Sequence, residues 1–366
     1  MAVTNRIEDF KNRLVAFLET EAPSRNEQAV AQLLLKNLPA NAFEVSYDNF
    51  GSVILHKPSR HANAPKVLIA AHMDEVGYQV RSIDEQGFVW VESVGGVWPS
   101  VVIGTKAVLV TSTGQRIEGV FGHTSVHVLS LEARAKALTN KELYVDFGFE
   151  SKQQALDLGV QIGDYIYLTG STVKFPHQPH LIAGKAMDNR AGLCVLVELA
   201  NAIAASELTV DLYLVGTVQE EVGTRGAKTV VDLIEPDVAI ALDTTVSHDT
   251  PNITAGTTKL GQGVALRMMD GGMMADPKLA NFLSTIANKH DIKHYKFISM
   301  GGGTDASALQ YTKGGASVIT ISLPQRYLRS PIGVCDVNDL LAASDLLTRF
   351  VLELNEDKYN NILKYK

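Results

Sequence analysis

Residues 210–244 read VDLYLVGTVQEEVGTRGAKTVVDLIEPDVAIALDT and indicate the fold most directly. Two apolar runs, 210–218 and 238–244, have the length of buried strands, and the segment 226–234 between them repeats its apolar residues at helical spacing. A strand, a helix and a second strand in this order are typical of a parallel sheet covered by helices.

The same alternation continues on both sides of this stretch. Apolar runs predict further strands at 67–72 and 317–324, and helical periodicity predicts helices at 5–19, 26–37, 190–205, 277–290 and 337–355. Ser24, with Glu27 three residues later, has the spacing of a capping box for the second helix. The sequence therefore predicts an α/β fold with a mostly parallel sheet that helices cover on both faces.

The segment between about 77 and 170 has a different sequence pattern. Short β-prone pieces such as FVWVES and DYIYLTG alternate with turns that contain glycine. We therefore expect a small β-rich domain, 77–170, inserted into an α/β domain made of 1–76 and 171–366.

Composition excludes several classes of protein. The chain has 366 residues, 46% hydrophobic and 20% charged, with a formal net charge of −7. These values suit a folded protein with a large core, and the acidic balance without a long basic run argues against nucleic acid as a partner. The most apolar long run, 192–205, is shorter than the roughly 20 residues that cross a bilayer, so no membrane partner is expected.

The cysteines and the N-terminus predict a cytoplasmic location. Cys194 and Cys335 lie among apolar residues and suit a reducing compartment in which thiols stay unpaired. The first 20 residues carry charges where a signal peptide would need an apolar stretch, and they are better interpreted as an amphipathic helix.

Polar residues gather where the predicted strands end, and the carboxyl ends of the strands are where α/β sheets place their functional groups. These residues are His72 and Asp74 in AHMDEVG, Asp188 in GKAMDNRAG, Glu220 and Glu221 in QEEVGTRGA, and Asp243 after 238–242. One imidazole and several carboxylates form the ligand set of a divalent metal such as zinc, manganese or cobalt.

Each of these residues also has an ordinary structural interpretation. Asp188 or Asp243 taken alone is most often a helix N-cap, and a lone His72 is more often hydrogen-bonded than a ligand. The coincidence of all of them at one edge of the sheet favours a metal site.

Other hydrolase mechanisms fit the pattern less well. A glycosidase would need two carboxylates on opposite sides of a cleft, whereas Glu220 and Glu221 are neighbours. A serine hydrolase of the elbow type is disfavoured because no G-x-S-x-G occurs, and the apolar surroundings of both cysteines disfavour a thiolate.

The motifs resemble, in order and over nearly the whole chain, the tetrahedral or glutamyl aminopeptidases of metallopeptidase family 42. The motifs are AHMDEVG (71–77), GKAMDNR (184–190), VQEEVGTRGA (218–227), LDTTVSHDTP (242–251), GGGTDASA (301–308) and RYLRSP (326–331). In the glycine-rich motif, Asp305 is expected to cap the next helix; no G-K-[ST] follows, so no phosphate loop or other cofactor site is predicted.

The resemblance implies a metal-dependent aminopeptidase that removes N-terminal residues from short peptides. His72 and Asp243 would bind one metal, Asp188 would bridge two, and Glu221 would bind the second. Asp74 would orient His72, and Glu220 would act as general base, taking a proton from metal-activated water and passing it to the leaving amine. The inserted domain would pair subunits into dimers that build a homo-oligomer, expected to be a dodecamer.

One position departs from the family's pattern. Arg329 stands in RYLRSP where the family has its last metal-binding histidine, and a guanidinium has no lone pair to offer a metal. The positive charges of one divalent ion and of the Arg329 guanidinium balance the three negative charges of Asp188, Asp243 and Glu221. Two divalent ions with a bound hydroxide would balance them equally well. We therefore favour one metal ion per subunit over two, zinc before cobalt or manganese. The alternatives are an Arg329 that points to solvent beside a weak second site, and a catalytically silent paralogue that binds peptides or serves a structural role.

Overall fold

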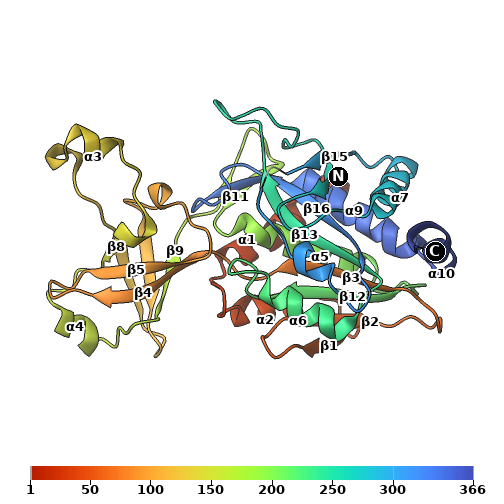
Figure 1. Ribbon diagram of the computed structural model, residues 1–366, viewed down its shortest axis with the longest axis horizontal. Helices are drawn as coiled ribbons and strands as arrows, with labels where there is room; N and C mark the ends of the chain where they lie inside the picture. Colours follow the sequence, from red (N-terminus) through yellow and green to blue (C-terminus); the bar gives the residue numbers. More distant parts are fainter. Residues whose placement is uncertain (1, 300, 366) are drawn as a thin grey trace.

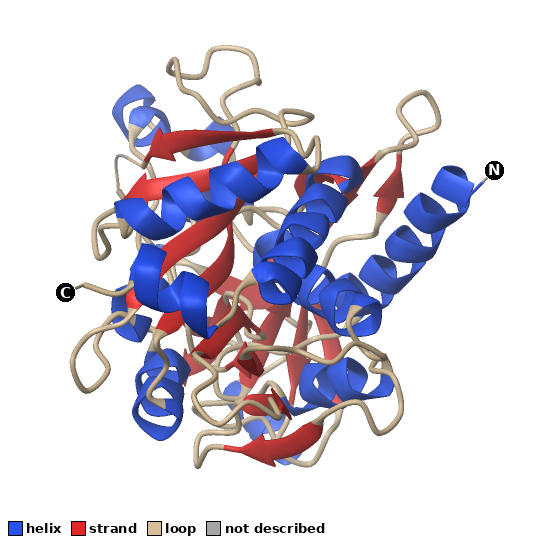
Figure 2. Cartoon of the chain, turned by 90° about the vertical axis from the view of Figure 1, so that its right-hand side faces the viewer, coloured by secondary structure: helices blue, strands red, loops and turns tan. Residues whose placement is uncertain are grey.

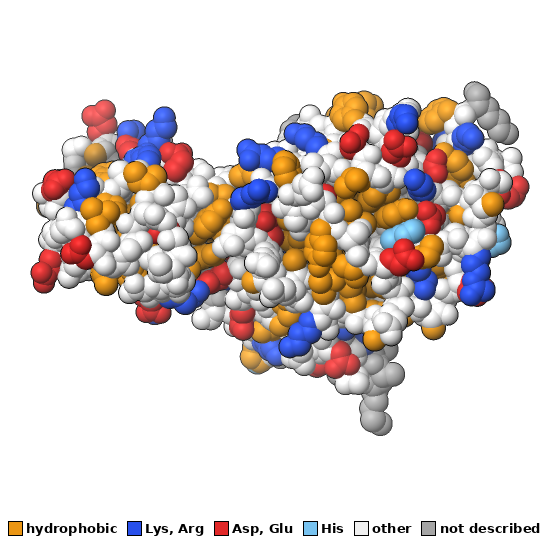
Figure 3. Space-filling model, turned by 90° about the horizontal axis from the view of Figure 1, so that it is seen from below, with side chains coloured by type: hydrophobic (Ala, Val, Ile, Leu, Met, Phe, Trp, Pro, Cys, Tyr) orange, Lys and Arg blue, Asp and Glu red, His pale blue; other side chains and the backbone are white. Residues whose placement is uncertain are grey.

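A computed structural model describes residues 2–299 and 301–365. A larger α/β body carries both ends of the chain, and a smaller β body extends from one side of it (Figure 1). In the space-filling view the two bodies form separate lobes with a hollow between them, and acidic and basic side chains are interspersed on that face (Figure 3).

The larger body is built on an eight-stranded mixed sheet with the strand order β1-β2-β12-β3-β13-β16-β14-β15. Its strands are β1 Glu44–Tyr47, β2 Val53–Lys57, β3 Lys66–His72, β12 Asp211–Thr217, β13 Val238–Val246, β14 Val264–Met269, β15 His294–Ile298 and β16 Ser317–Gln325. The pairs β12/β3, β3/β13, β13/β16 and β14/β15 are parallel, whereas β1/β2, β2/β12 and β16/β14 are antiparallel. The sheet is therefore parallel at its centre and mixed towards its edges, less uniform than the sequence predicts.

Helices lie against the sheet in two groups (Figure 2). One group contains α1 Ala2–Glu19, α5 Met187–Ala202, α7 Pro277–Lys289 and α9 Val337–Glu353; the other contains α6 Arg225–Ile234 and α8 Ala306–Leu309. The larger body also contains α2 Gln28–Lys36. After α9 follow α10 Glu356–Lys358 and a π-helical turn, Tyr359–Leu363. No helix within 2–299 and 301–365 has the length and apolar content that crossing a membrane requires.

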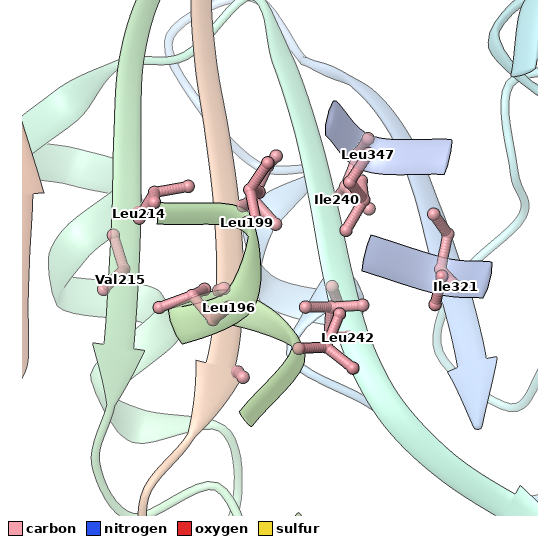
Figure 4. Close-up of a cluster of buried hydrophobic side chains, with 14 of the residues drawn as sticks. Leu196, Leu199, Leu214, Val215, Ile240, Leu242, Ile321 and Leu347 are labelled. Carbon is pink, nitrogen blue, oxygen red and sulfur yellow. The ribbon is translucent and has the colours of Figure 1, made fainter. Parts of the chain in front are cut away.

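The core forms where α5 packs on the sheet. Leu196 and Leu199 of α5 lie among Leu214 of β12 and Ile240 and Leu242 of β13, all fully or almost fully buried (Figure 4). Because α5 is enclosed between the sheet and the helices α1 and α9, it is apolar on nearly all sides. This explains the apolar run 192–197 within α5, and it fixes the start of the helix, where Asp188 lies.

The smaller body is a closed antiparallel barrel with the strand order β4-β5-β8-β7-β6-β9. Its elements are β4 Gly77–Ile83, β5 Val89–Val94, β6 Lys106–Val110, β7 Arg116–Phe121, β8 Tyr144–Asp146 and β9 Tyr165–Leu168, with the helices α3 Leu131–Ala135 and α4 Lys152–Asp157 and the 3-10 turns Pro99–Val101, Val126–Val128 and Asn140–Glu142. Closure leaves no open sheet edge, and the barrel has a hydrophobic core of its own around Tyr78, Val91 and Phe121.

A third, three-stranded sheet was not predicted from the sequence. It contains β10 Val173–Lys174, β11 Leu181–Gly184 and β17 Gly333–Asp336, all antiparallel. Gly184 pairs with Gly333, so the segment after β11 and the loop before β17 leave the sheet side by side. This pairing brings the loop 326–332 next to Asp188.

Two capping predictions are wrong. The side chain of Ser24 does not cap α2, because its hydroxyl donates to Asp74, and Glu27 accepts from the backbone N–H groups of Arg25 and Gln219 instead. Asp305 precedes α8 without capping it, because its carboxylate is turned towards Thr217.

Candidate functional site

The register of the central strands gathers the predicted site residues at one edge of the sheet. His72, the last residue of β3, pairs with Thr217 at the end of β12, and its neighbour Ala71 pairs with Leu242 of β13. Asp243 therefore lies level with His72, and Glu220 and Glu221 follow β12 at the same edge. Asp188 reaches this edge from the start of α5.

The imidazole of His72 is the centre of the cluster. Its Nε2 atom lies 3.3 Å from Oδ1 of Asp188, 3.8 Å from Oδ1 of Asp243 and 3.9 Å from Oε2 of Glu220. Its Nδ1 atom lies 3.1 Å from the carbonyl oxygen of Asp74 and 3.3 Å from the Oδ1 atom of that residue. Because Nδ1 is engaged on the Asp74 side, Nε2 is the nitrogen that faces the other carboxylates.

Asp74 also fixes the main chain that carries the two glutamates. The N–H of Glu220 donates to Oδ1 of Asp74 over 2.9 Å, and the N–H of Glu221 donates to Oδ2 over 3.1 Å. The hydroxyl of Ser24 donates to Oδ2 over 2.5 Å. Asp74 is fully buried; burial acts to raise its pKa, but His72 and the hydrogen bonds from Ser24 and the N–H of Glu220 together keep the pKa of Asp74 below its ordinary value. One ionised carboxylate thus connects β3, the strand end of β12 and the N-terminal segment.

The carboxyl groups around His72 influence one another strongly. Burial raises the pKa of Glu220 well above its ordinary value, and burial raises the pKa of Asp243 as well. Burial, with the nearby charge of Asp188, raises the pKa of Glu221 to about 7. Burial acts on Asp188 too, but His72 and the positive charge of Arg329 hold its pKa below the usual range. Such opposed shifts in adjacent carboxyl groups are typical of functional sites.

Arg329 lies inside this cluster and does not point away into solvent. Its Nη1 atom contacts Oε2 of Glu221, and its Nη2 atom lies 3.9 Å from Oδ2 of Asp188. Burial opposes the charge of Arg329, but Asp188 and Glu221 outweigh it and hold the pKa of the guanidinium above its ordinary value.

A buried ion cluster beside the site was missed by the sequence reasoning. Glu75 accepts from Nζ of Lys185 over 2.8 Å, from Nη2 of Arg190 over 3.2 Å and from the N–H of Ala22 over 2.8 Å. Arg190 also donates to main-chain carbonyls at the end of α1, including that of Phe17 over 2.8 Å. Glu75 lies in the same motif as His72, and Lys185 and Arg190 lie in the same motif as Asp188. This closeness in sequence was the signal that could have identified the ion cluster.

Asp305 is a second carboxyl group that sequence reasoning placed wrongly. Its Oδ2 atom accepts from the hydroxyl of Thr217 over 2.5 Å, while Oδ1 is buried without a hydrogen-bond partner among the described residues. Burial raises the pKa of Asp305 to about 7. Asp305 therefore holds the end of β12 through its hydrogen bond with Thr217.

The barrel approaches the cluster through the loop after β5. A side chain at Gly95 would bring its Cβ within 3.0 Å of Cβ of Glu221, and one at Gly96 would lie 3.9 Å from Nη1 of Arg329. A small cavity, partly open to solvent, is lined by Asp188, Glu221 and Arg329 among others. The cluster is therefore accessible at the boundary of the two bodies.

The residues present fit one divalent ion. One ligand atom each from His72, Asp188 and Asp243 lie within 4.8 Å of one another. The separations of 3.3 and 3.8 Å from Nε2 of His72 to Asp188 and Asp243 are close to the roughly 3.4 Å between ligands of a tetrahedral zinc site. A second group of His72, Glu220 and Glu221 meets the same distance limit, but it shares His72 with the first.

A separate second ion is not matched in the same way. Glu221 has an oxygen engaged by Arg329, and Arg329 has no lone pair to contribute. The donor set beside Asp188 is therefore short of ligands for a second metal.

Comparison with known proteins identifies relatives over the whole chain. The family profile described as M42 glutamyl aminopeptidase matches residues 51–346. The glutamyl aminopeptidase of Lactococcus lactis subsp. cremoris (strain MG1363) is 33% identical over 357 residues, covering 97% of this chain and 99% of the relative.

Solved structures give the same result. The aminopeptidase APDkam598 from the archaeon Desulfurococcus kamchatkensis superposes with a TM-score of 0.91 at 33% identity, covering 98% of this chain and 99% of that one. The TET1 peptidase of Pyrococcus horikoshii, which can assemble into a tetrahedron or a large octahedral shell, superposes with a TM-score of 0.83 at 28% identity, covering 94% of this chain and 100% of that one.

Proposed function

Because the chain belongs to the M42 family of glutamyl aminopeptidases, we propose that it is a metal-dependent aminopeptidase that removes N-terminal residues from short peptides. The observation that carries this proposal is the convergence of His72, Asp188 and Asp243 around one point, with Glu220 beside them. Peptide hydrolysis is the activity of the family, and the geometry supplies the groups that such a reaction needs.

His72, Asp188 and Asp243 would hold the divalent ion, with zinc favoured because a histidine and two carboxylates suit it. When bound, such an ion polarises a carbonyl group and lowers the pKa of water. Asp74 positions His72 and holds the main chain at Glu220 and Glu221, so it acts as a positioning residue.

Glu220 would serve as the general base. Its carboxylate lies 3.9 Å from Nε2 of His72, directly beside the ligand group, and a carboxylate in this position can accept a proton from water and give it up again. In that role it takes a proton from the attacking water and delivers it to the amine that leaves. Its neighbour Glu221 is turned towards Arg329, so the two glutamates have different tasks.

The decisive experiment compares Glu220→Gln with His72→Ala, using hydrolysis of aminoacyl anilides and metal content per subunit. We expect Glu220→Gln to retain metal and lose turnover, since an amide does not accept the proton, and His72→Ala to lose metal. Glu118→Gln, on the barrel strand β7, is the matched control and should change neither quantity. Turnover retained in Glu220→Gln would remove Glu220 from the base role, and a metal-loaded unmodified chain without hydrolysis would favour the silent paralogue.

We also propose that residues 77–170 form an inserted assembly domain, with 1–76 and 171–366 as the catalytic domain. The closed barrel with its own core supports this division. The segment between β7 and β8 of the barrel exposes apolar side chains, since Val126, Val128 and Leu131 are each more than half exposed. Exposed apolar groups of this kind suit a contact between subunits. Because a dodecamer is among the solved structures of the TET1 relative, we propose a homo-oligomer of twelve subunits built from dimers.

A further inference from the structure

Arg329 is placed as part of the carboxylate cluster. Glu221, whose side chain is 2% exposed, directs Oε2 at Nη1 of Arg329, and Asp188 lies 3.9 Å from Nη2 of the same guanidinium. Asp74 holds Glu221 from the opposite side through the main-chain N–H. The guanidinium thus occupies the space between two carboxylates, on the far side of Asp188 from His72.

The loop that carries Arg329 is fixed on both sides. Arg326 and Val334 exchange main-chain hydrogen bonds of 3.0 and 3.1 Å, and the hydroxyl of Ser330 donates to the carbonyls of Tyr327 and Ile332. The side chain of Arg329 is 38% exposed, and a Cβ added at Gly96, in the loop after β5, would lie 3.9 Å from its Nη1 atom. The guanidinium is therefore held against Glu221 by the fold of its loop and by the barrel.

The charges of the site balance with one metal ion. Asp188, Asp243 and Glu221 bring three negative charges when ionised; one divalent ion and the guanidinium bring three positive charges. A second divalent ion would lie beside a permanent positive charge and would compete with it for Glu221. Its remaining ligands would be too few for a closed or catalytic zinc site.

We propose that the guanidinium of Arg329 occupies the place of a second cation, so that the site binds a single divalent ion per subunit through His72, Asp188 and Asp243. This inference rests on the proposed metal-dependent function. Arg329 also lines the small cavity beside the cluster.

Metal stoichiometry tests the inference without any measurement of activity. The protein is saturated with Co²⁺, bound metal per subunit is measured by elemental analysis after desalting, and the same binding is followed by calorimetric titration. We expect one ion per subunit in the unmodified protein. Arg329→His replaces the cation with a neutral ligand beside Asp188 and Glu221 and should raise the value to two.

Two further variants separate the explanation from unspecific effects. Arg326→His changes an arginine of the same loop that pairs with Asp249 outside the cluster, at 2.7 Å, and should stay at one ion. Arg329→Lys keeps the positive charge and should also stay at one.

The outcomes are distinct. Two tightly bound ions in the unmodified protein, two ions in Arg329→Lys, or one ion in a folded Arg329→His would each overturn the inference while the proposed function stands. No bound ion in the unmodified protein would overturn the metal-dependent function itself.

Discussion

Replacing Asp74 by asparagine should damage the site more than its small change in shape suggests. The carboxylate of Asp74 accepts three hydrogen bonds, from the N–H of Glu220 on Oδ1 and from the N–H of Glu221 and the hydroxyl of Ser24 on Oδ2, and Nδ1 of His72 lies 3.3 Å from Oδ1. An amide keeps one acceptor oxygen and gains two N–H donors. Whichever way it turns, its NH₂ group faces a main-chain N–H that has no freedom to rotate.

The magnitude follows from that count. One main-chain N–H and one amide N–H lose their partners in a fully buried place, and each unsatisfied group costs about 1–3 kcal/mol, so the free energy of unfolding should fall by about 2–6 kcal/mol. Since His72 loses the carboxylate that orients it, metal affinity should also fall by about 10–100-fold. Urea unfolding at a matched subunit concentration and calorimetric titration with Co²⁺ measure the two effects.

Asp84→Asn is the matched control. Asp84 accepts from the N–H groups of Gln86 and Phe88 on one oxygen and from Nε1 of Trp90 on the other, in a turn of the barrel that water reaches. At this position the remaining side-chain oxygen of an asparagine still accepts from the two main-chain N–H groups. We therefore expect the free energy of unfolding to fall by less than about 1 kcal/mol. If Asp74→Asn also stays within about 1 kcal/mol of the unmodified protein and binds Co²⁺ equally well, the positioning role assigned to Asp74 is wrong.

Two further predictions concern pH and assembly. Burial raises the pKa of Asp339 to about 7, so the native state retains a proton that the unfolded chain releases near pH 3.9. The contribution of this protonated carboxyl group to the free energy of unfolding is therefore complete below about pH 4 and is lost as the pH rises through 7. The urea midpoint of Asp339→Asn should therefore fall less steeply than that of the unmodified protein between pH 5 and 8, and equal slopes would contradict this. For assembly, light scattering at micromolar concentration should give the mass of a homo-oligomer of twelve subunits, and a monomeric mass would refute the proposed role of the barrel.

The central part of the fold was predictable because it depends on local patterns. The apolar runs at 210–218 and 238–244 became β12 and β13, and the helical spacing between them became α6. Parallel strands share one carboxyl edge, so residues that follow different strands were expected to meet, and the structure brings His72, Glu220 and Asp243 together.

The features that were missed depend on contacts between distant segments. Nothing local in 181–184 or 333–336 indicates that these residues pair, yet this pairing carries Arg329 to Asp188. Ser24 has the spacing of a capping residue, but Asp74, 50 positions along the chain, offers its hydroxyl a buried ionised acceptor. A hydrogen bond to a charged group is stronger than one to a main-chain amide, so the tertiary contact prevails over the local motif.

The buried charge clusters around Glu75 and around His72 differ in a way that indicates which of them takes a ligand. Glu75 is surrounded by its own cations, Lys185 and Arg190, and its pKa stays below the ordinary value although it is fully buried. That cluster is complete without any added ion, and its role is to join α1, β3 and the start of α5.

The cluster around His72 is short of positive charge. Glu220, Glu221 and Asp243 all have raised pKa values; in the described part of the chain the cations within ion-pair distance of them are His72 and Arg329, and Arg267 acts on Asp243 from farther away. Carboxyl groups are not kept together in a buried place unless something compensates them. Arg329 supplies one positive charge at the Glu221 side, and the remaining deficit lies at His72, Asp188 and Asp243, where a divalent ion would restore the balance. The same bookkeeping of charges therefore argues both for a metal ion at His72 and against a second one at Arg329.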